Sequence, residues 1–325
     1  MIGEKNYQKE GRRFSILRKL VFFFGGLILI GGFTMGASAL FVARKALMEK
    51  IEEALIMKAK DTAEIVDGRI NSFLQFLEGL ARMPVFRDRQ ASYQEKIAVL
   101  KSEVAFNENL HTAAISDTEG FMYTLDNQKL KSGDRDWFNS VLQGNRFATE
   151  PYLSRSDNKM IQTFAVPIYD DNQQVIGLIM CDINAEWLSD QIDDIVVGQS
   201  GDCSIFGPTG TFIADKDRSL VEKQIKMHEE AKKNEAFRSV AAFIDTAVES
   251  DQSAVGFYEY KDKKKIGSYA TIKALDWTIT VTAPVNEFMG TVDELRLEMI
   301  GIGAVTLMIA LAIVYFIAGA MVKPV

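Results

Sequence analysis

Two long apolar segments without a charged residue, 20–43 and 299–322, lie near the two ends of this 325-residue chain. Each is longer than the roughly 20 apolar residues that a helix needs to cross the hydrocarbon core of a bilayer, which is about 30 Å thick. A helix satisfies all of its own backbone polar groups, as a segment in lipid must. We therefore predict two transmembrane helices that flank a polar region, residues 44–298.

A cleaved signal peptide is the alternative for the first segment. An ordinary signal peptide has a shorter apolar core and ends at small residues, whereas Arg44 and Lys45 follow this segment. The sequence favours a helix that stays in the membrane as an anchor.

Basic residues next to the two segments predict the orientation, because Lys and Arg close to a membrane helix are retained in the cytoplasm. Without the two ends, the polar region keeps 37 − 7 = 30 basic and 44 − 2 = 42 acidic residues, a net charge of −12 that argues against nucleic acid as a partner. We expect a two-pass protein of the inner (cytoplasmic) membrane with residues 44–298 in the periplasm or outside the cell. The basic residues at the two ends are Lys5, Lys9, Arg12, Arg13, Arg18, Lys19 and Lys323.

Apolar residues recur at helical spacing from residue 44 to residue 83, which predicts one long amphipathic helix that ends at Pro84. Its later apolar residues alternate steps of four and three, the heptad pattern of a helix that packs along another helix. This pattern favours a homodimer seam, with packing on the helix's own domain as the alternative. A second helix is expected at 94–108. The apolar stripe consists of Leu47, Ile51, Leu55, Val66, Ile70, Phe73, Leu77 and Leu80.

Beyond residue 110 the pattern changes to short strands and turns, and it repeats. Hairpins around Gly120 and Gly210 are 210 − 120 = 90 residues apart, and two further hairpins contain Gly177 and Gly267 at the same offset. Glycine permits the positive φ of tight turns and the close approach of strands. The shared offset indicates a duplication, and we predict an α+β fold with two stacked modules, each built on an antiparallel sheet.

The sequence contains no motif of the common enzyme classes: no Gly-rich phosphate loop, no G-x-S-x-G, no H-E-x-x-H and no Cys/His cluster. His111 and His228 are far apart in sequence, and Cys181 and Cys203 lie in apolar, strand-like runs typical of buried cysteines. We expect no enzyme, no catalytic residue, no cofactor and no metal site.

Four short motifs follow one another in the polar region. They are D-R-D-W-F at residues 134–138, Glu150-Pro151-Tyr152, Val166-Pro167-Ile168, and a strand that contains Gly177 and ends in Asp182-Ile183. With the long first helix and the flanking membrane segments, this run resembles the double-Cache family of extracellular sensor domains, over essentially the whole chain. The resemblance implies two PAS-like modules, of which the membrane-distal one binds small molecules and the membrane-proximal one passes on the change.

The resemblance also implies a ligand-binding set of Arg135, Trp137, Phe138, Tyr152 and Asp182. Arg135 and Trp137 would hold a ligand carboxylate, Phe138 and Tyr152 would wall the pocket, and Asp182 would hold a ligand ammonium, so the site suits a zwitterion. The alternative is that Arg135 and Asp182 pair with each other or with backbone groups.

Two positions depart from the amino-acid-binding version of the family. Leu130 stands where those members often have Tyr, and Ser154 stands where they often have Asp. Asp157, on the same loop, could replace the missing carboxylate. The expected ligand is an amino acid or an amine, and another small metabolite is the alternative.

Lys323-Pro324-Val325 resembles the start of a HAMP linker. The resemblance implies a bacterial receptor most like a methyl-accepting chemotaxis protein, which would signal to cytoplasmic proteins through a part outside this chain. The alternatives are the sensor part of a histidine kinase or cyclic-dinucleotide enzyme, and a surface protein that binds only a protein partner. The expected division is a cytoplasmic tail (1–19), a transmembrane helix (20–43), the long helix with its lead-in helix (44–110), the membrane-distal module (111–194), the membrane-proximal module (195–287), a juxtamembrane helix (288–298), a transmembrane helix (299–322) and the start of the linker (323–325).

Overall fold

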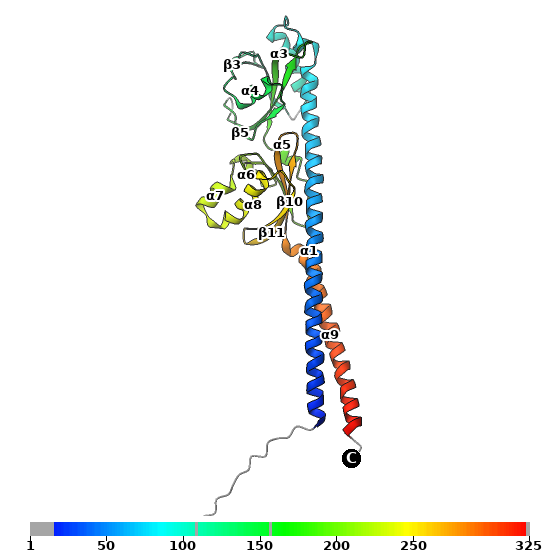
Figure 1. The fold of residues 1–325 in the computed structure, drawn as a ribbon. Helices are drawn as coiled ribbons and strands as arrows, with labels where there is room; N and C mark the ends of the chain where they lie inside the picture. Colours follow the sequence, from blue (N-terminus) through cyan, green and yellow to red (C-terminus); the bar gives the residue numbers. More distant parts are fainter. Residues whose placement is uncertain (1–15, 108–109, 156–157, 323–325) are drawn as a thin grey trace, which may run out of the picture. The chain divides into compact units, whose positions relative to one another are not determined.

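The structure is a computed structural model that describes residues 16–107, 110–155 and 158–322. It contains a long N-terminal helix, two antiparallel sheets with short helices, and a long C-terminal helix (Figure 1). The predicted α+β class, with a long helix and two antiparallel sheets, is confirmed. Most of the expected cytoplasmic tail, Asp157 and the HAMP-like residues 323–325 lie outside the described residues.

Helix α1 (Ile16–Ala81) has 66 residues and joins the first apolar segment to the amphipathic helix without a break. It ends shortly before Pro84, which begins the short helix α2 (Pro84–Arg87), because proline has no N–H to donate inside a helix. The expected second helix is α3 (Tyr93–Phe106), and a capping box fixes its start. There, the Ser92 side chain accepts from the Glu95 N–H, and the Glu95 carboxylate accepts from the Ser92 N–H.

Among the described residues, two helical segments are long and apolar enough to cross a membrane: the part of α1 that begins at Phe22, and Arg296–Ile317 of helix α9 (Val285–Val322). Neither apolar stretch is buried inside the protein. Such extended apolar surface is unfavourable in water, so both segments fit helices surrounded by lipid. At Gly25, a Cβ would lie 2.9 Å from the Leu311 side chain, so glycine allows α1 and α9 to approach closely there.

The first sheet has the strand order β3-β2-β1-β7-β6-β4, and β5 also pairs with β6. Pro167 lies in β6 beyond its pairing with β4, so its missing N–H falls where no ladder bond is required on that side. Helix α4 (Asp136–Leu142) packs on one face of this sheet. The strands are β1 (Leu110–Ser116), β2 (Phe121–Thr124), β3 (Lys129–Lys131), β4 (Phe147–Ala148), β5 (Tyr152–Leu153), β6 (Met160–Tyr169) and β7 (Val175–Asn184).

The second sheet has the order β10-β11-β12-β8-β9. A layer of short helices covers one face, and Phe243 of the longest, α8, lies against the sheet: a Cβ at Gly256 or Gly267 would come within 2.7 and 2.8 Å of its ring. The strands are β8 (Asp202–Phe206), β9 (Phe212–Asp215), β10 (Ala254–Tyr260), β11 (Lys263–Ile272) and β12 (Trp277–Pro284); the helices are α6 (Arg218–Glu222), α7 (Met227–Lys233), the 3₁₀ helix η1 (Glu235–Phe237) and α8 (Arg238–Glu249).

The later part of the apolar stripe of α1, from Val66 to Leu80, is covered by its own chain. Val66, Ile70 and Leu77 are fully buried, and the ring of Phe73 contacts Phe164 of β6 at 5.0 Å and Trp187 at 5.4 Å between centroids. The side chains whose heptad pattern favours a homodimer seam therefore pack on their own domain, in agreement with the alternative prediction. A dimer contact along this part of α1 would have to use the opposite face of the helix.

The internal repeat holds for one pair of hairpins and not for the other. Gly120 and Gly210 both have positive φ, +91° and +74°, and precede the second strands of β1–β2 and β8–β9, which occupy equivalent places in the two sheets. The second match is wrong, because Gly177 lies on β7, next to β1, whereas Gly267 lies on β11, which is separated from β8 by β12. By sheet order, the equivalent of β7 is β12.

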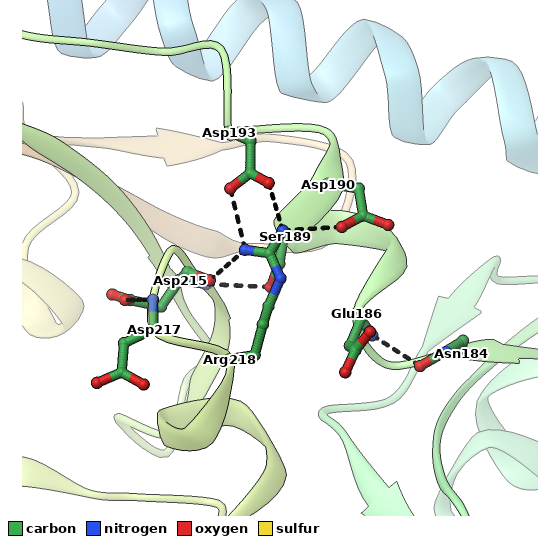
Figure 2. A network of polar contacts seen from close by, with 8 residues as sticks. All are labelled: Asn184, Glu186, Ser189, Asp190, Asp193, Asp215, Asp217 and Arg218. Carbon is green, nitrogen blue, oxygen red and sulfur yellow. Dashed lines mark hydrogen bonds and ion pairs between the residues drawn. The ribbon is translucent and has the colours of Figure 1, made fainter.

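A linker with helix α5 (Trp187–Asp190) joins the two sheets, and Arg218 at the start of α6 holds it (Figure 2). The guanidinium of Arg218 donates to both carboxylate oxygens of Asp193, to Asp190 at 2.8 Å and to the Asp215 carbonyl at 2.7 Å. The Asp215 N–H donates to the Ser189 hydroxyl at 3.2 Å. These bonds fasten the linker to the end of β9.

The second sheet passes directly into the C-terminal helix, because β12 ends at Pro284 and α9 begins at Val285, earlier than the expected boundary at residue 288. In the first turn of α9, the Glu287 carboxylate accepts from the N–H groups of Gln199 and Ser200 at 2.7 and 3.1 Å, and from the Ser200 hydroxyl. The hydrogen bonds from Ser200 and Gln199 lower the pKa of Glu287. The start of α9 is thereby tied to the loop that precedes β8.

Candidate ligand-binding site

A cavity of about 570 Å³ lies between the two sheets, next to the D-R-D-W-F segment. The first sheet and its loops contribute Arg135, Trp137 and Tyr152, three of the five residues predicted to bind a ligand. The second sheet contributes Trp277 and its neighbouring turns. The volume is typical of small-molecule sites, and the lining combines aromatic rings with a few charged groups.

Arg135 is the N-cap residue of α4, where its extended backbone turns the chain into the helix. Arg135 borders the cavity, and its Nε atom is buried with no hydrogen-bond partner among the described residues. A buried donor without a partner is costly, and an acceptor such as a carboxylate in the cavity would remove that cost. Nearby, Asp134 pairs with Arg155 at 3.2 Å, and the hydrogen bond from Arg155 lowers the pKa of Asp134.

The aromatic pair that follows Arg135 is divided between the cavity and the core. Trp137 borders the cavity and is 3% exposed. Phe138 is buried in the core formed by α4 and the sheet, under the turn where Gly120 meets Gly133, and it does not border the cavity. The structure therefore places Phe138 behind the wall that Trp137 forms.

Tyr152 and Asp182 are connected through Thr163, which lies opposite Asp182 on the neighbouring strand. The Thr163 hydroxyl donates to Asp182 at 2.5 Å and is 2.6 Å from the Tyr152 hydroxyl. Because Thr163 has one proton and gives it to Asp182, Tyr152 must donate to Thr163. Burial raises the pKa of Tyr152, the negative charge of Asp182 adds to this increase, and the hydrogen bond to Thr163 and the charges of Arg135 and Arg155 oppose it. Asp182 itself is buried and does not border the cavity.

The two positions that depart from the amino-acid-binding pattern also lie off the cavity. Leu130, on β3, is 40% exposed, and Ser154 is buried with its N–H donated to the Lys159 carbonyl. Neither side chain borders the cavity. The difference from the amino-acid-binding pattern at these two positions therefore does not change the part of the cavity that Arg135, Trp137 and Tyr152 line.

Sequence reasoning missed the contacts that close the cavity from the second sheet. Glu150 accepts from the Thr209 N–H at 3.1 Å and from its hydroxyl at 2.7 Å, and the Gln224 side chain donates to the Pro151 carbonyl. Glu150 and Pro151 directly precede Tyr152 in the Glu-Pro-Tyr motif. That motif was visible in the sequence, but its partners are 59 and 73 residues away along the chain.

Comparison with known proteins identifies the fold family. The profile of the Cache domain family matches residues 42–292, which is most of the chain. The chain belongs to the Cache domain family. The predicted double-Cache resemblance is confirmed.

Relatives of this Cache chain include bacterial chemoreceptors. Methyl-accepting chemotaxis protein TlpA of Bacillus subtilis is 23% identical over 324 residues, which cover 96% of this chain and 45% of TlpA, so the chain spans less than half of that relative. The ligand-binding domain of the Pseudomonas fluorescens chemoreceptor CtaA, solved with L-isoleucine, superposes with a TM-score of 0.59 at 17% identity over 77% of this chain and 99% of that domain. The ligand-binding domain of the Pseudomonas aeruginosa amino acid chemoreceptor PctB, solved with L-Arg, gives a TM-score of 0.56 at 18% identity over 74% and 98%.

Proposed function

We propose that this Cache chain is the sensory part of a two-pass transmembrane chemoreceptor that binds a small extracellular ligand with its membrane-distal module, residues 111–194. The observation that carries this proposal is the cavity beside Arg135, whose buried Nε has no hydrogen-bond partner in the described part of the chain. The similarity to TlpA along 96% of this chain supports chemotaxis over a histidine kinase or cyclic-dinucleotide output. We assign the chain a binding role and no catalytic one.

The ligand class follows from the charges around the cavity. Arg135 and the indole N–H of Trp137 would bind a carboxylate. Tyr152, which also borders the cavity, would contact the same ligand. Asp182, through Thr163 and Tyr152, would set the polarity of the Tyr152 hydroxyl and attract an ammonium group. An α-amino acid presents both charges, and the L-Arg in the PctB structure and the L-isoleucine in the CtaA structure belong to this class. An amine is the alternative ligand.

A ligand in this cavity would touch both modules, because Trp277 of the proximal module, residues 195–287, also borders it. Closure around the ligand would move the Glu150–Tyr152 segment. This segment is hydrogen-bonded to the proximal module, because Glu150 accepts from Thr209 and the Pro151 carbonyl accepts from Gln224. From there, β12 continues into α9 at Val285. A ligand transmits a signal only if it binds one of two arrangements more tightly than the other.

In the proposed topology, residues 1–19 and 323–325 are cytoplasmic and residues 44–298 lie outside the inner membrane. The receptor would act as a homodimer and would signal to cytoplasmic proteins through a part outside these 325 residues. The outward face of α1, with Met57 at 59% and Ile65 at 50% exposure, supports a dimer contact there.

A thermal-shift screen of the full chain in nanodiscs tests the proposal. A ligand that binds only the native state at 100 times its Kd stabilises that state by about 2.7 kcal/mol. The screen uses L-amino acids and, for each amino acid that stabilises, its amide and its 2-hydroxy acid. The amide lacks the carboxylate that Arg135 would bind, and the hydroxy acid lacks the ammonium, so both analogues should lose the shift.

Arg135→Ala should remove the shift, and Arg238→Ala should keep it, because Arg238 is 72% exposed and pairs only with Glu235 among the described residues. A thermal shift that persists in both Arg135→Ala and Tyr152→Phe would show that the ligand binds outside this cavity. A screen in which no small molecule stabilises the chain would favour a protein partner.

A further inference from the structure

The membrane-proximal module contains a second cavity, of about 310 Å³, between the second sheet and its helical layer. It shares no lining residue with the cavity between the sheets. Its floor consists of polar residues on strands β8, β9, β11 and β12, and its walls are apolar side chains of α6, α7 and α8 with Phe206 and Phe212. A polar floor under apolar walls is the usual construction of a small-molecule site.

Three carboxylates line the cavity: Asp217 caps α6, and Asp202 and Asp215 lie on the strands of the floor in different environments. Asp202 is neutralised, since the Lys265 ammonium lies 3.0 Å away and the Thr282 hydroxyl also donates to it. Asp215 accepts from the Ser204 hydroxyl at 2.6 Å and from the Asp217 N–H at 2.7 Å. In the part of the chain that the structure describes, no basic side chain forms an ion pair with Asp215. A carboxylate offers about four acceptor positions, so Asp215 can accept further hydrogen bonds from a molecule in the cavity.

Aromatic rings form part of the cavity wall, with Phe243 from α8 and with Phe206, Phe212 and Tyr258 from the strands of the sheet. The rings of Phe243 and Tyr258 stack at 4.7 Å between centroids, and those of Phe206 and Phe212 lie 4.6 Å apart. Gly256 and Gly267 make room for the Phe243 ring, because a Cβ at either position would collide with it. Aromatic faces attract cations as well as apolar groups, so the wall suits the same ligand that the carboxylate selects.

We propose that this cavity is a second binding site, for a small organic ammonium ion with an apolar group, which Asp215 binds through its carboxylate and the Phe243–Tyr258 pair covers. The site belongs to the proximal module and is separate from the distal site proposed above. Asp215 lies next to the Arg218 contacts that hold the linker between the modules (Figure 2), so a ligand here would act on the same connection.

Isothermal titration calorimetry of the full chain in nanodiscs tests this site with 2-phenylethylamine, and with 3-phenylpropan-1-ol as a neutral molecule of similar size. The amine should bind and the alcohol should bind at least tenfold more weakly. Asp215→Asn should weaken the amine at least tenfold, and Leu220→Trp, which places an indole at the cavity wall, should block it in a chain whose floor is unchanged. Arg135→Ala should leave amine binding unchanged.

Three results would overturn the proposal: no binding of the amine, equal binding of amine and alcohol, or binding that is lost in Arg135→Ala and kept in Asp215→Asn. The last result would assign the amine to the distal cavity. A chain that binds amino acids in an Arg135-dependent manner but no amine would keep the distal proposal and reject this one.

Discussion

Glu150 accepts two hydrogen bonds from Thr209, one from the backbone N–H and one from the hydroxyl, and so joins the loop before Tyr152 to the first hairpin of the second sheet. Thr209→Val removes the hydroxyl and keeps the backbone donor. We expect this change to lower the free energy of unfolding by about 1 kcal/mol, a typical value for one hydrogen bond. Urea unfolding of the chain in detergent, followed by tryptophan fluorescence, measures the change.

Thr209→Ser is the matched control, because it keeps the hydroxyl and should unfold as the unchanged chain does. Equal stability of Thr209→Val and Thr209→Ser would show that the backbone N–H alone holds Glu150. Reduced ligand affinity in Thr209→Val, with no change in Thr209→Ser, would further indicate that this contact supports the cavity beside it.

Local rules were sufficient to predict several elements of this fold. Neighbouring residues alone determine the two uncharged apolar segments, the helix stop at Pro84 and the glycine turns at Gly120 and Gly210. The match of Gly177 with Gly267 failed because two local hairpins can look alike while occupying different places in a sheet. Gly267 is required for a different reason, the close approach of Phe243.

The candidate site was only partly readable from the sequence for the same physical reason. Arg135, Trp137 and Tyr152 are close in sequence to recognisable motifs, and the structure brings them to one cavity. Trp277 and Thr209 reach that cavity or its border through the packing of two sheets, which no local pattern specifies. Phe138 was expected in the wall, but its position in the α4 helix turns it into the core.

Thr163→Val interrupts the connection between Tyr152 and Asp182 and removes one donor from a buried carboxylate. We expect the unfolding free energy to fall by about 1–3 kcal/mol and the affinity for an amino acid to fall about tenfold. Calorimetric titration and thermal unfolding of the same variant measure both quantities. Thr246→Val, on the exposed surface of α8, is the control; unchanged affinity in Thr163→Val would exclude Asp182 from ligand binding.

The proximal cavity predicts a pH dependence of stability. Burial raises the pKa of Asp215 from an ordinary value of 3.8 to about 6; hydrogen bonds from Ser204 and the Asp217 N–H oppose the increase, and the charges of Asp202 and Asp217 add to it. Because the folded chain then binds the proton more tightly, the stabilisation is complete below about pH 4 and is lost as the pH rises through 6.

Asp215→Asn should therefore raise the unfolding free energy by about 1–2 kcal/mol at pH 7, after allowance for solvent screening, with no gain at pH 4. Thermal unfolding of both chains between pH 4 and pH 8 measures the difference. The other charged groups at the cavity are present in both chains, so their contributions cancel; they are Asp202, Asp217, Lys216, Lys261 and Lys265. A gain at pH 4 equal to that at pH 7 would contradict the raised pKa.

Because the α1 stripe packs on its own domain, truncation of a side chain in the stripe should destabilise the fold without changing the association of one chain with another. Leu77 is fully buried, so Leu77→Ala should cost about 2–5 kcal/mol. Phe106 of α3, which is 84% exposed, is the control, and Phe106→Ala should change the free energy of unfolding by less than about 0.5 kcal/mol. Urea unfolding distinguishes the two; similar small costs for both variants would mean that Leu77 is not packed.

The first turn of α9 provides the contact at which a change in the proximal module would reach the C-terminal helix. Glu287 accepts hydrogen bonds from the N–H groups of Gln199 and Ser200. Its carboxylate also interacts favourably with the positive end of the helix dipole at the N-terminus of α9. Glu287→Ala should release these two amides, and their hydrogen exchange should become at least tenfold faster. Exchange measured by mass spectrometry on peptides that contain residues 197–201 tests this, and peptides from β12, which stay paired in the sheet, serve as the internal control.

Because hydrogen bonding lowers the pKa of Glu287, the unchanged chain should show the same acceleration only when the pH falls through that lowered pKa. Unaltered exchange at residues 199 and 200 in Glu287→Ala would mean that β12 alone connects the second sheet to α9.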